Sequence, residues 1–116
     1  MKRLGPEETE LAARDGREIL ERITWLTNGE LVLIGVEKTA GWDKLYRDPG
    51  DGRLWLLTFP SGELQGGGPP KLTAARLDES EISGEFISPA EWDARMEKYM
   101  RDNNIRVIMP GDRRHQ

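Results

Sequence analysis

The sequence predicts an α+β fold, an antiparallel β-sheet arranged as a meander of about four to six strands with a C-terminal amphipathic helix packed on one face. Two observations support this prediction. Between residues 18 and 77, short apolar segments alternate with turn sequences rich in Asn, Asp, Pro and Gly, which is typical of strands joined by tight turns. After residue 88 the apolar spacing changes to that of a helix. We expect residues 1–110 to form one domain and residues 111–116 a disordered tail.

The N-terminal segment fits more than one local structure. Pro6 followed by two glutamates favours a short helical turn that ends near Ala13. Residues 18–27 fit a helical stripe and a strand alternation about equally well. The following Asn28-Gly29 is a strong hairpin signal because both residues tolerate positive φ. We therefore predict an antiparallel pair of strands at 18–27 and 30–37.

A second hairpin is predicted from residues 42–46 and 53–59. The linking sequence Asp48-Pro49-Gly50-Asp51-Gly52 consists of turn-forming residues throughout. Apolar residues occupy both alternating faces of 53–59, which is typical of a central strand. A loop at 61–70 then leads into another predicted strand at 71–77.

The C-terminal part is predicted to be mainly helical. Residues 85–87 favour a short strand, after which Ser88 as N-cap and Glu91 three residues later suggest a capping box. The sequence Asp102-Asn103-Asn104 ends the helix, and residues 105–109 favour a last extended segment on the sheet. One apolar stripe on the helix is expected to pack on the open face of the sheet. It consists of Trp92, Met96, Tyr99 and Met100.

The residue inventory argues against most catalytic chemistry. The chain has no Cys and a single His, His115, next to its C-terminus. Thiol nucleophiles, disulfides and Cys-based metal sites are excluded, and a Ser-His-Asp triad or a His-ligated metal is disfavoured. A hydrolase would have to work with carboxylates alone. Gly66-Gly67-Gly68-Pro69-Pro70 lacks the Gly-Lys-Ser/Thr sequence and helix start of a phosphate loop. We predict no enzyme activity, no metal and no cofactor.

The negative charge of the chain is concentrated in one stretch. The formal net charge is −4, and residues 63–93 contain seven acidic residues against Lys71 and Arg76. Those acids are Glu63, Asp78, Glu79, Glu81, Glu85, Glu91 and Asp93. A nucleic-acid-binding surface has the opposite charge, so direct binding to nucleic acid is not expected. No apolar segment is long enough for a membrane span and the first residues do not resemble a signal peptide, which favours a cytoplasmic protein.

One long segment has a recognisable pattern of Gly, Trp, Asp and Pro residues, Gly41-Trp42-Asp43-Lys44-Leu45-Tyr46-Arg47-Asp48-Pro49-Gly50-Asp51-Gly52-Arg53-Leu54-Trp55. The pattern extends to Thr58-Phe59-Pro60, Glu63 and the Gly-Pro loop, and upstream to residues 8–11 and 22–26. Together these segments resemble the immunity protein 27 family of bacterial polymorphic toxin systems. Leu56 and Gln65 replace the Glu and the His that the family usually has at these places.

The resemblance implies a non-enzymatic cytoplasmic protein that binds and neutralises a cognate toxin domain, such as a nuclease with a basic groove. We expect a monomer or weak homodimer and no membrane partner. The predicted partner-binding residues belong to the hairpin turn, the Gly-Pro loop and the acids that follow. They are Trp42, Tyr46, Asp48, Asp51, Arg53, Glu63, Gln65, Gly66, Gly67, Gly68, Pro69, Pro70, Asp78, Glu79 and Glu81. Arg53 is expected to pair with Asp48 or Asp51 and to hold the turn. The alternative function is a small-molecule-binding module that uses the Gly-rich loop and exposed Trp residues.

Overall fold

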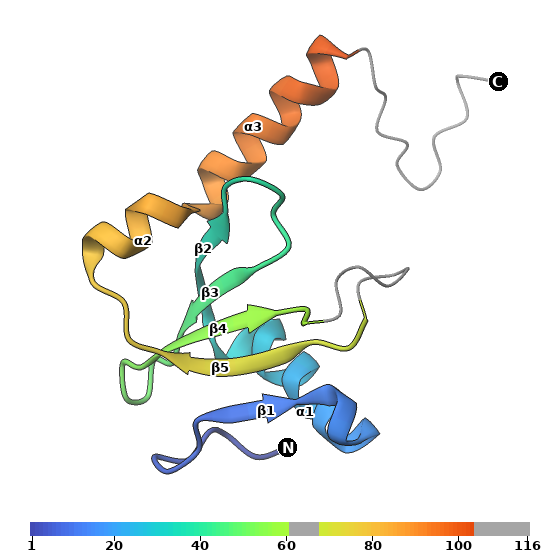
Figure 1. Cartoon of the computed structure of the whole chain (residues 1–116), viewed down its shortest axis with the longest axis vertical. Coiled ribbons are helices and arrows are strands. Elements are labelled where there is room, and N and C mark those ends of the chain that lie inside the picture. The colour runs from blue at the N-terminus through green and yellow to red at the C-terminus, as the bar shows by residue number, and fades with distance from the viewer. Residues whose placement is uncertain (61–67, 104–116) are drawn as a thin grey trace, which may run out of the picture.

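A computed structural model describes residues 1–60 and 68–103 of the chain. Within these residues, six strands form one antiparallel sheet in the order β1-β5-β4-β3-β2-β6 (Figure 1). The strands are β1 (Glu10–Ala12), β2 (Val32–Glu37), β3 (Lys44–Arg47), β4 (Leu54–Thr58), β5 (Lys71–Ala75) and β6 (Phe86–Ile87). The helices are α1 (Arg17–Trp25), α2 (Glu79–Glu85) and α3 (Pro89–Asp102). A 3-10 turn spans Ala13–Asp15, and a wide helical turn spans Leu26–Glu30.

The predicted α+β class and antiparallel meander are confirmed. Strands β2, β3, β4 and β5 follow one another in both sequence and space, which matches the predicted strands at 30–37, 42–46, 53–59 and 71–77. Strand β4 lies between β3 and β5, as its two apolar faces predicted. The short strand predicted at 85–87 is β6, which pairs with the outer edge of β2.

The strand predicted at 18–27 is wrong, because this segment forms helix α1. Ile23 and Leu26 are 2% and 1% exposed, and a helix places both residues on the same face. A strand would have put them on opposite faces. The Asn28-Gly29 sequence lies in the turn after the helix, where the Leu31 N–H donates to the Leu26 carbonyl at 2.8 Å. Backbone freedom at Gly therefore terminates a helix here instead of making a hairpin.

The helical turn predicted from Pro6 to Ala13 is also wrong, because residues 10–12 form strand β1. This strand pairs with β5 in the register Leu11–Leu72. The Ala74 N–H donates to the Thr9 carbonyl at 2.8 Å, and the Ala13 N–H donates to the Pro70 carbonyl at 3.0 Å. The unpaired edge of β5 thus provides tertiary hydrogen bonds that a local helical turn cannot replace.

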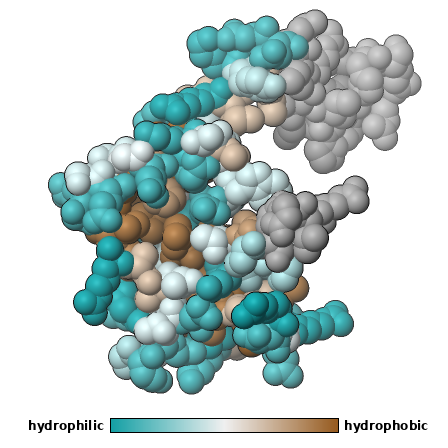
Figure 2. All heavy atoms as spheres, viewed as in Figure 1, coloured by the Kyte–Doolittle hydropathy of each residue, from teal (hydrophilic) through white to brown (hydrophobic). Residues whose placement is uncertain are grey.

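The sheet buries apolar side chains on both faces. On one face α1 packs against Tyr46, Trp55 and Leu72, and the last two are fully buried. On the other face Leu45 is fully buried and Phe86 is 6% exposed. A Cβ added to Gly35 would lie 3.0 Å from the Phe86 Cβ, so this Gly lets Phe86 pack directly on β2. Figure 2 shows the hydrophobic side chains of this second face gathered beneath α2.

The predicted C-terminal helix, α3, packs against the sheet only at its base. The helix itself and its N-cap are confirmed, since the Ser88 hydroxyl accepts a hydrogen bond from the Glu91 N–H at 3.1 Å. The Glu91 carboxylate pairs with Arg95 instead of completing the predicted capping box. No described residue of α3 is buried, and the helix projects away from the sheet after contacting β2 (Figure 1). The contact of α3 with the sheet is to β2, next to the edge strand β6. The extended segment predicted at 105–109 and the predicted tail lie outside the described residues.

Candidate functional site

The β3–β4 turn is held by a dense set of hydrogen bonds. The Asp48 N–H donates to the Arg53 carbonyl at 2.8 Å, and the Asp48 carboxylate accepts from the Gly50 N–H at 2.8 Å. Asp51 accepts from the Arg53 N–H at 2.9 Å and from Arg53 Nε at 2.8 Å. The backbone N–H and the guanidinium of Arg53 lower the pKa of the Asp51 carboxyl. Gly52 has a φ of 79°, which L side chains rarely adopt.

Arg53 connects this turn to the N-terminal segment. Its Nη1 donates to the Glu8 carbonyl and its Nη2 to the Gly5 carbonyl, both at 2.7 Å. Its guanidinium also lies 4.8 Å from the centre of the Trp55 ring, within the range of a cation–π contact. The expected pairing of Arg53 with Asp51 is confirmed, while Asp48 contacts Arg3 at 3.5 Å. The contacts of Arg53 are therefore structural.

Strand register separates the predicted site into two ends. Lys44 pairs with Leu57, and Leu57 pairs with Leu72, at what we term the loop end of the sheet. Arg47, Leu54 and Ala75 are aligned at the opposite end, which we term the turn end. Trp42 and Gly68–Pro70 lie at the loop end, whereas Asp51 and Arg53 lie at the turn end. A five-residue strand such as β4 separates the two ends by roughly 15 Å.

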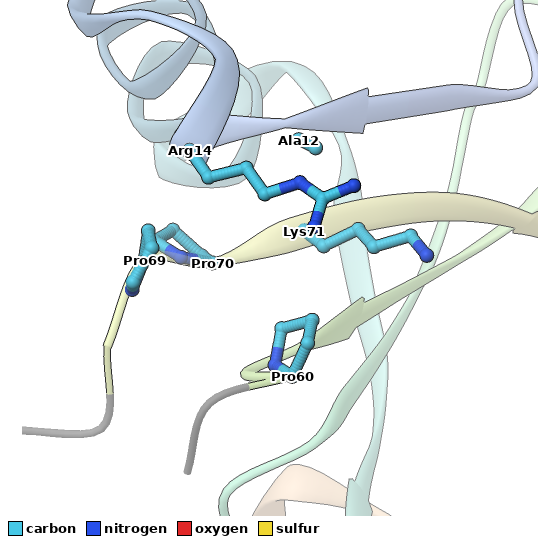
Figure 3. A pocket seen from close by; sticks show the side chains of 6 residues that line it. All are labelled: Ala12, Arg14, Pro60, Pro69, Pro70 and Lys71. Atoms are coloured by element: carbon cyan, nitrogen blue, oxygen red, sulfur yellow. The ribbon is translucent and has the colours of Figure 1, made fainter. Parts of the chain in front are cut away.

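At the loop end, Trp42 is 53% exposed and makes an edge-on contact with Phe59, with ring centroids 5.7 Å apart. Trp42, a member of the predicted partner-binding set, is therefore accessible at the surface. A nearby pocket is lined by Ala12, Arg14, Pro60, Pro69, Pro70 and Lys71. Figure 3 shows the prolines along one side of this pocket and the long side chains of Arg14 and Lys71 along the other.

The predicted acids Asp78, Glu79 and Glu81 lie at the start of helix α2. Asp78 caps the helix by accepting from the Glu81 N–H at 2.8 Å, and Glu81 Oε1 accepts from the Asp78 N–H at 3.2 Å. The Glu81 N–H lowers the pKa of the Asp78 carboxyl. Glu79 and Glu85 are exposed. We call Asp78, Glu79, Glu81 and Glu85 the acidic strip; between residues 77 and 94 the sequence has six acidic residues and no Lys or Arg.

The acidic strip ends beside two acids that the sequence analysis missed. Asp43 is half-buried, and burial raises the pKa of its carboxyl, with further contributions from the charges of Glu37 and Glu85. The Glu85 carbonyl accepts from the Lys38 N–H at 3.0 Å, which fixes the end of α2 at the β2–β3 turn. The carboxylates of Glu37, Asp43 and Glu85 therefore lie close together, and Asp43 directly follows Trp42 in the sequence. These carboxylates come from three separate segments, so no local spacing could have revealed them.

Two residues of the predicted partner-binding set are buried. Tyr46 is 6% exposed within the core, and burial raises the pKa of its hydroxyl. Asp48 is 4% exposed and holds the turn. Neither side chain is accessible to a partner. Glu63, Gln65, Gly66 and Gly67 lie outside the described residues. Trp42, Asp51, Pro69, Glu79 and Glu81 are exposed, while Arg53, Gly68 and Pro70 are half-buried.

Residues 1–60 and 68–103 contain neither a cluster of metal ligands nor a membrane-spanning helix. No group of three His, Asp or Glu side chains in these ranges is placed to hold a metal ion. No helix in the same ranges has the length and apolar character needed to cross a membrane.

Comparison with known proteins places the chain in a family. No curated protein and no solved structure matches it. A sequence model of the family described as immunity protein 27 matches residues 12–75, which is more than half of the chain. The matched span ends with the last residue of β5 and includes α1, the β3–β4 hairpin and Trp42. The chain belongs to the immunity protein 27 family.

Proposed function

We propose that this chain is an immunity protein that binds a cognate toxin domain in the cytoplasm and neutralises it without catalysis. The family membership supports this function. The residue inventory agrees with it, since the chain has no Cys and one His near its C-terminus. Inhibition by covering the surface of a toxin requires complementary shape and charge but no catalytic group. The acidic residues of this chain provide the charge.

The acidic strip is the structural feature that supports this proposal most strongly. Its four carboxylates are exposed and follow one another along α2 from the turn end toward the loop end. Glu37 and Asp43 extend the negative charge to the neighbourhood of Trp42. Exposed Trp residues are frequent hot spots of protein interfaces, and a neighbouring patch of one charge favours a partner of the opposite charge. We infer that the toxin presents a basic surface, as the substrate groove of a nuclease would.

Growth rescue is the first test of this function. The toxin domain encoded next to this chain is expressed alone and together with it, and growth is measured. We expect rescue by the wild-type chain and a complex of the purified pair in size-exclusion chromatography at micromolar concentration. Failure to rescue and absence of a complex would reject this toxin as the partner.

Charge reversal tests the interface itself. Glu79→Lys with Glu85→Lys reverses two exposed acids of α2 without touching the Asp78–Glu81 cap. We expect association to slow by about tenfold or more at low salt, and the difference from wild type to shrink as salt is added. Glu18→Lys with Glu21→Lys makes the same charge change on the exposed side of α1 and serves as the control. Equal effects of the two double variants would contradict the assignment to α2.

A further inference from the structure

Helix α3 presents an apolar stripe that the described chain does not cover. Trp92 and Met96 are half-buried, and Tyr99 is 55% exposed. Local interactions stabilise the helix. Ser88 caps its N-terminus, and three basic residues each make an i,i+4 ion pair, namely Arg95, Lys98 and Arg101. An amphipathic helix of this length normally gains most of its stability by packing its apolar face. Among residues 1–60 and 68–103 nothing covers Tyr99, and a second helix packed on the stripe would bury it.

The stripe forms one wall of a groove. The other wall is the β2–β3 turn at Lys38, Thr39 and Ala40. The base of α3 is fixed against this turn, because a Cβ on Gly41 would lie 2.3 Å from the Trp92 ring. Gly41 has a φ of 78°, so this position needs Gly for both its conformation and its space. Beyond this contact α3 projects from the sheet (Figure 1), and Tyr99 in its outer part is 55% exposed.

The spacing along α3 identifies what fits the stripe. Trp92, Met96 and Tyr99 occupy alternating d, a and d positions of a heptad, and Asn103 takes the next a position. Arg95 and Asp102 then take the two g positions. In an antiparallel helix pair with its two-fold axis between Met96 and Tyr99, Met96 faces Tyr99 of the second copy. Each Arg95 then lies beside Asp102 of the other copy. The seam therefore pairs opposite charges at both of its g positions.

We propose that α3 is a self-association surface, on which two copies of this chain pair their α3 helices antiparallel through Trp92, Met96 and Tyr99. A helix of this length extends roughly 21 Å, so the seam alone is small compared with the ~1,200 Å² of a stable interface. The dimer is therefore weak and forms in the micromolar range. The acidic strip on α2 is not part of this groove. Charge reversal on α2 and substitutions in α3 therefore test toxin binding and self-association separately.

Sedimentation velocity of the full chain, from low micromolar to several hundred micromolar, tests the proposal. We expect a reversible shift from monomer to dimer in the wild type. Tyr99→Glu introduces a charge at an exposed position of the seam, so the fold is retained and the dimer is lost. Arg95→Asp should weaken the dimer by about tenfold because it places two acids at each pairing site. A wild type that stays monomeric over the whole range would overturn the proposal.

Two further variants separate pairing from a loss of helix. Arg101→Asp removes an i,i+4 pair with Glu97 just as Arg95→Asp removes one with Glu91, but it lies away from the seam. We expect it to dimerise like the wild type. Combining Arg95→Asp with Asp102→Arg restores opposite charges between copies and should recover the dimer. If Arg101→Asp weakens the dimer as much as Arg95→Asp, or if the combined variant is no better than Arg95→Asp alone, antiparallel pairing is wrong. Circular dichroism of each variant checks that α3 remains helical.

Discussion

Arg22 holds Glu8 in a bidentate ion pair, with Nη1 donating to Oε2 and Nη2 donating to Oε1, both at 2.7 Å. The same guanidinium donates to the carbonyls of Lys2 and Arg3, each at 2.9 Å. Glu8 also accepts from the Gly5 N–H at 2.7 Å. Because Arg22 belongs to α1, these bonds attach the N-terminal segment to the helix that covers the main core. The hydrogen bonds from Arg22 contribute most to lowering the pKa of Glu8 to about 2.

Stability should fall in acid because of this pair. The Glu8 carboxyl has a lower pKa in the folded chain than its ordinary value of 4.5, so the folded state favours the ionised form. Its contribution is fully present above pH 4.5 and is lost as the pH falls from 4.5 toward 2. We expect this contribution to be about 2 kcal/mol, since both side chains are mostly shielded from water. Urea unfolding at a series of pH values measures it.

Glu8→Gln isolates the contribution of the ion pair. At neutral pH this variant should lose about 2 kcal/mol, because Arg22 keeps its position but loses its counterion. The difference between Glu8→Gln and the wild type should shrink as the pH falls below 4.5. Glu7→Gln, at the exposed neighbouring residue, is the matched control and should leave the profile unchanged. A constant difference at every pH would show that Glu8 acts through packing and not through its charge.

Arg53 should be the most sensitive residue of the β3–β4 turn. Arg53→Ala removes the hydrogen bonds to the Gly5 and Glu8 carbonyls and the contact with Trp55, and should cost about 2–3 kcal/mol. Arg53→Lys should recover less than half of this loss, because an ammonium group cannot reproduce the planar fork of the guanidinium. Hydrogen exchange should show faster opening of residues 5–9 in both variants. Full recovery by Lys would mean that only the charge matters. Arg47→Ala, at an exposed position of the same hairpin, is the control.

Local turn chemistry predicted the central part of the fold well. The sequence from Asp48 to Gly52 allows one hairpin, and the two-sided apolar pattern around Trp55 is compatible with a central strand. The segment at 18–27 was misassigned because Ile19 and Ile23 satisfy both periods, and only the burial of Leu26 against the sheet separates them. Strand β1 was missed because its three residues form a strand only by pairing with the edge of β5, which lies far away in the sequence. No sequence window contains that information.

The candidate site was predictable only where its residues are close in sequence. The choice of Asp78, Glu79 and Glu81 followed from the local concentration of negative charge in the sequence. The burial of Tyr46 and Asp48 did not, because it depends on α1 and on the N-terminal segment that Arg22 and Arg53 hold in place. Likewise, the pairing of Glu8 with Arg22 joins residues 14 positions apart with no shared pattern.

Two glycines should respond to Ala in opposite directions. A Cβ added at Gly52 or at Gly84 would meet no atom within 4 Å, so neither substitution causes a clash. Gly52 has a φ of 79°, and Gly52→Ala should cost about 1 kcal/mol through backbone strain. Gly84 lies inside α2, where Gly84→Ala should add about 0.5–1 kcal/mol of stability. Thermal unfolding of both variants checks this. Equal shifts in Tm would show that φ at Gly52 is not the controlling factor.

Trp42 should contribute to toxin binding much more than to folding. Its side chain is 53% exposed and contacts Phe59 by an edge, so Trp42→Ala should cost the fold only about 1 kcal/mol. If Trp42 is a central contact of the proposed interface, the same variant should weaken the complex by about 2 kcal/mol or more, which is roughly thirtyfold in Kd. Leu20→Ala, at an apolar residue of α1 that is 39% exposed, should leave Kd unchanged. Calorimetric titration of the toxin domain with both variants provides the comparison. A Trp42→Ala variant that binds as tightly as the wild type would move the interface away from the loop end and leave the acidic strip as its centre.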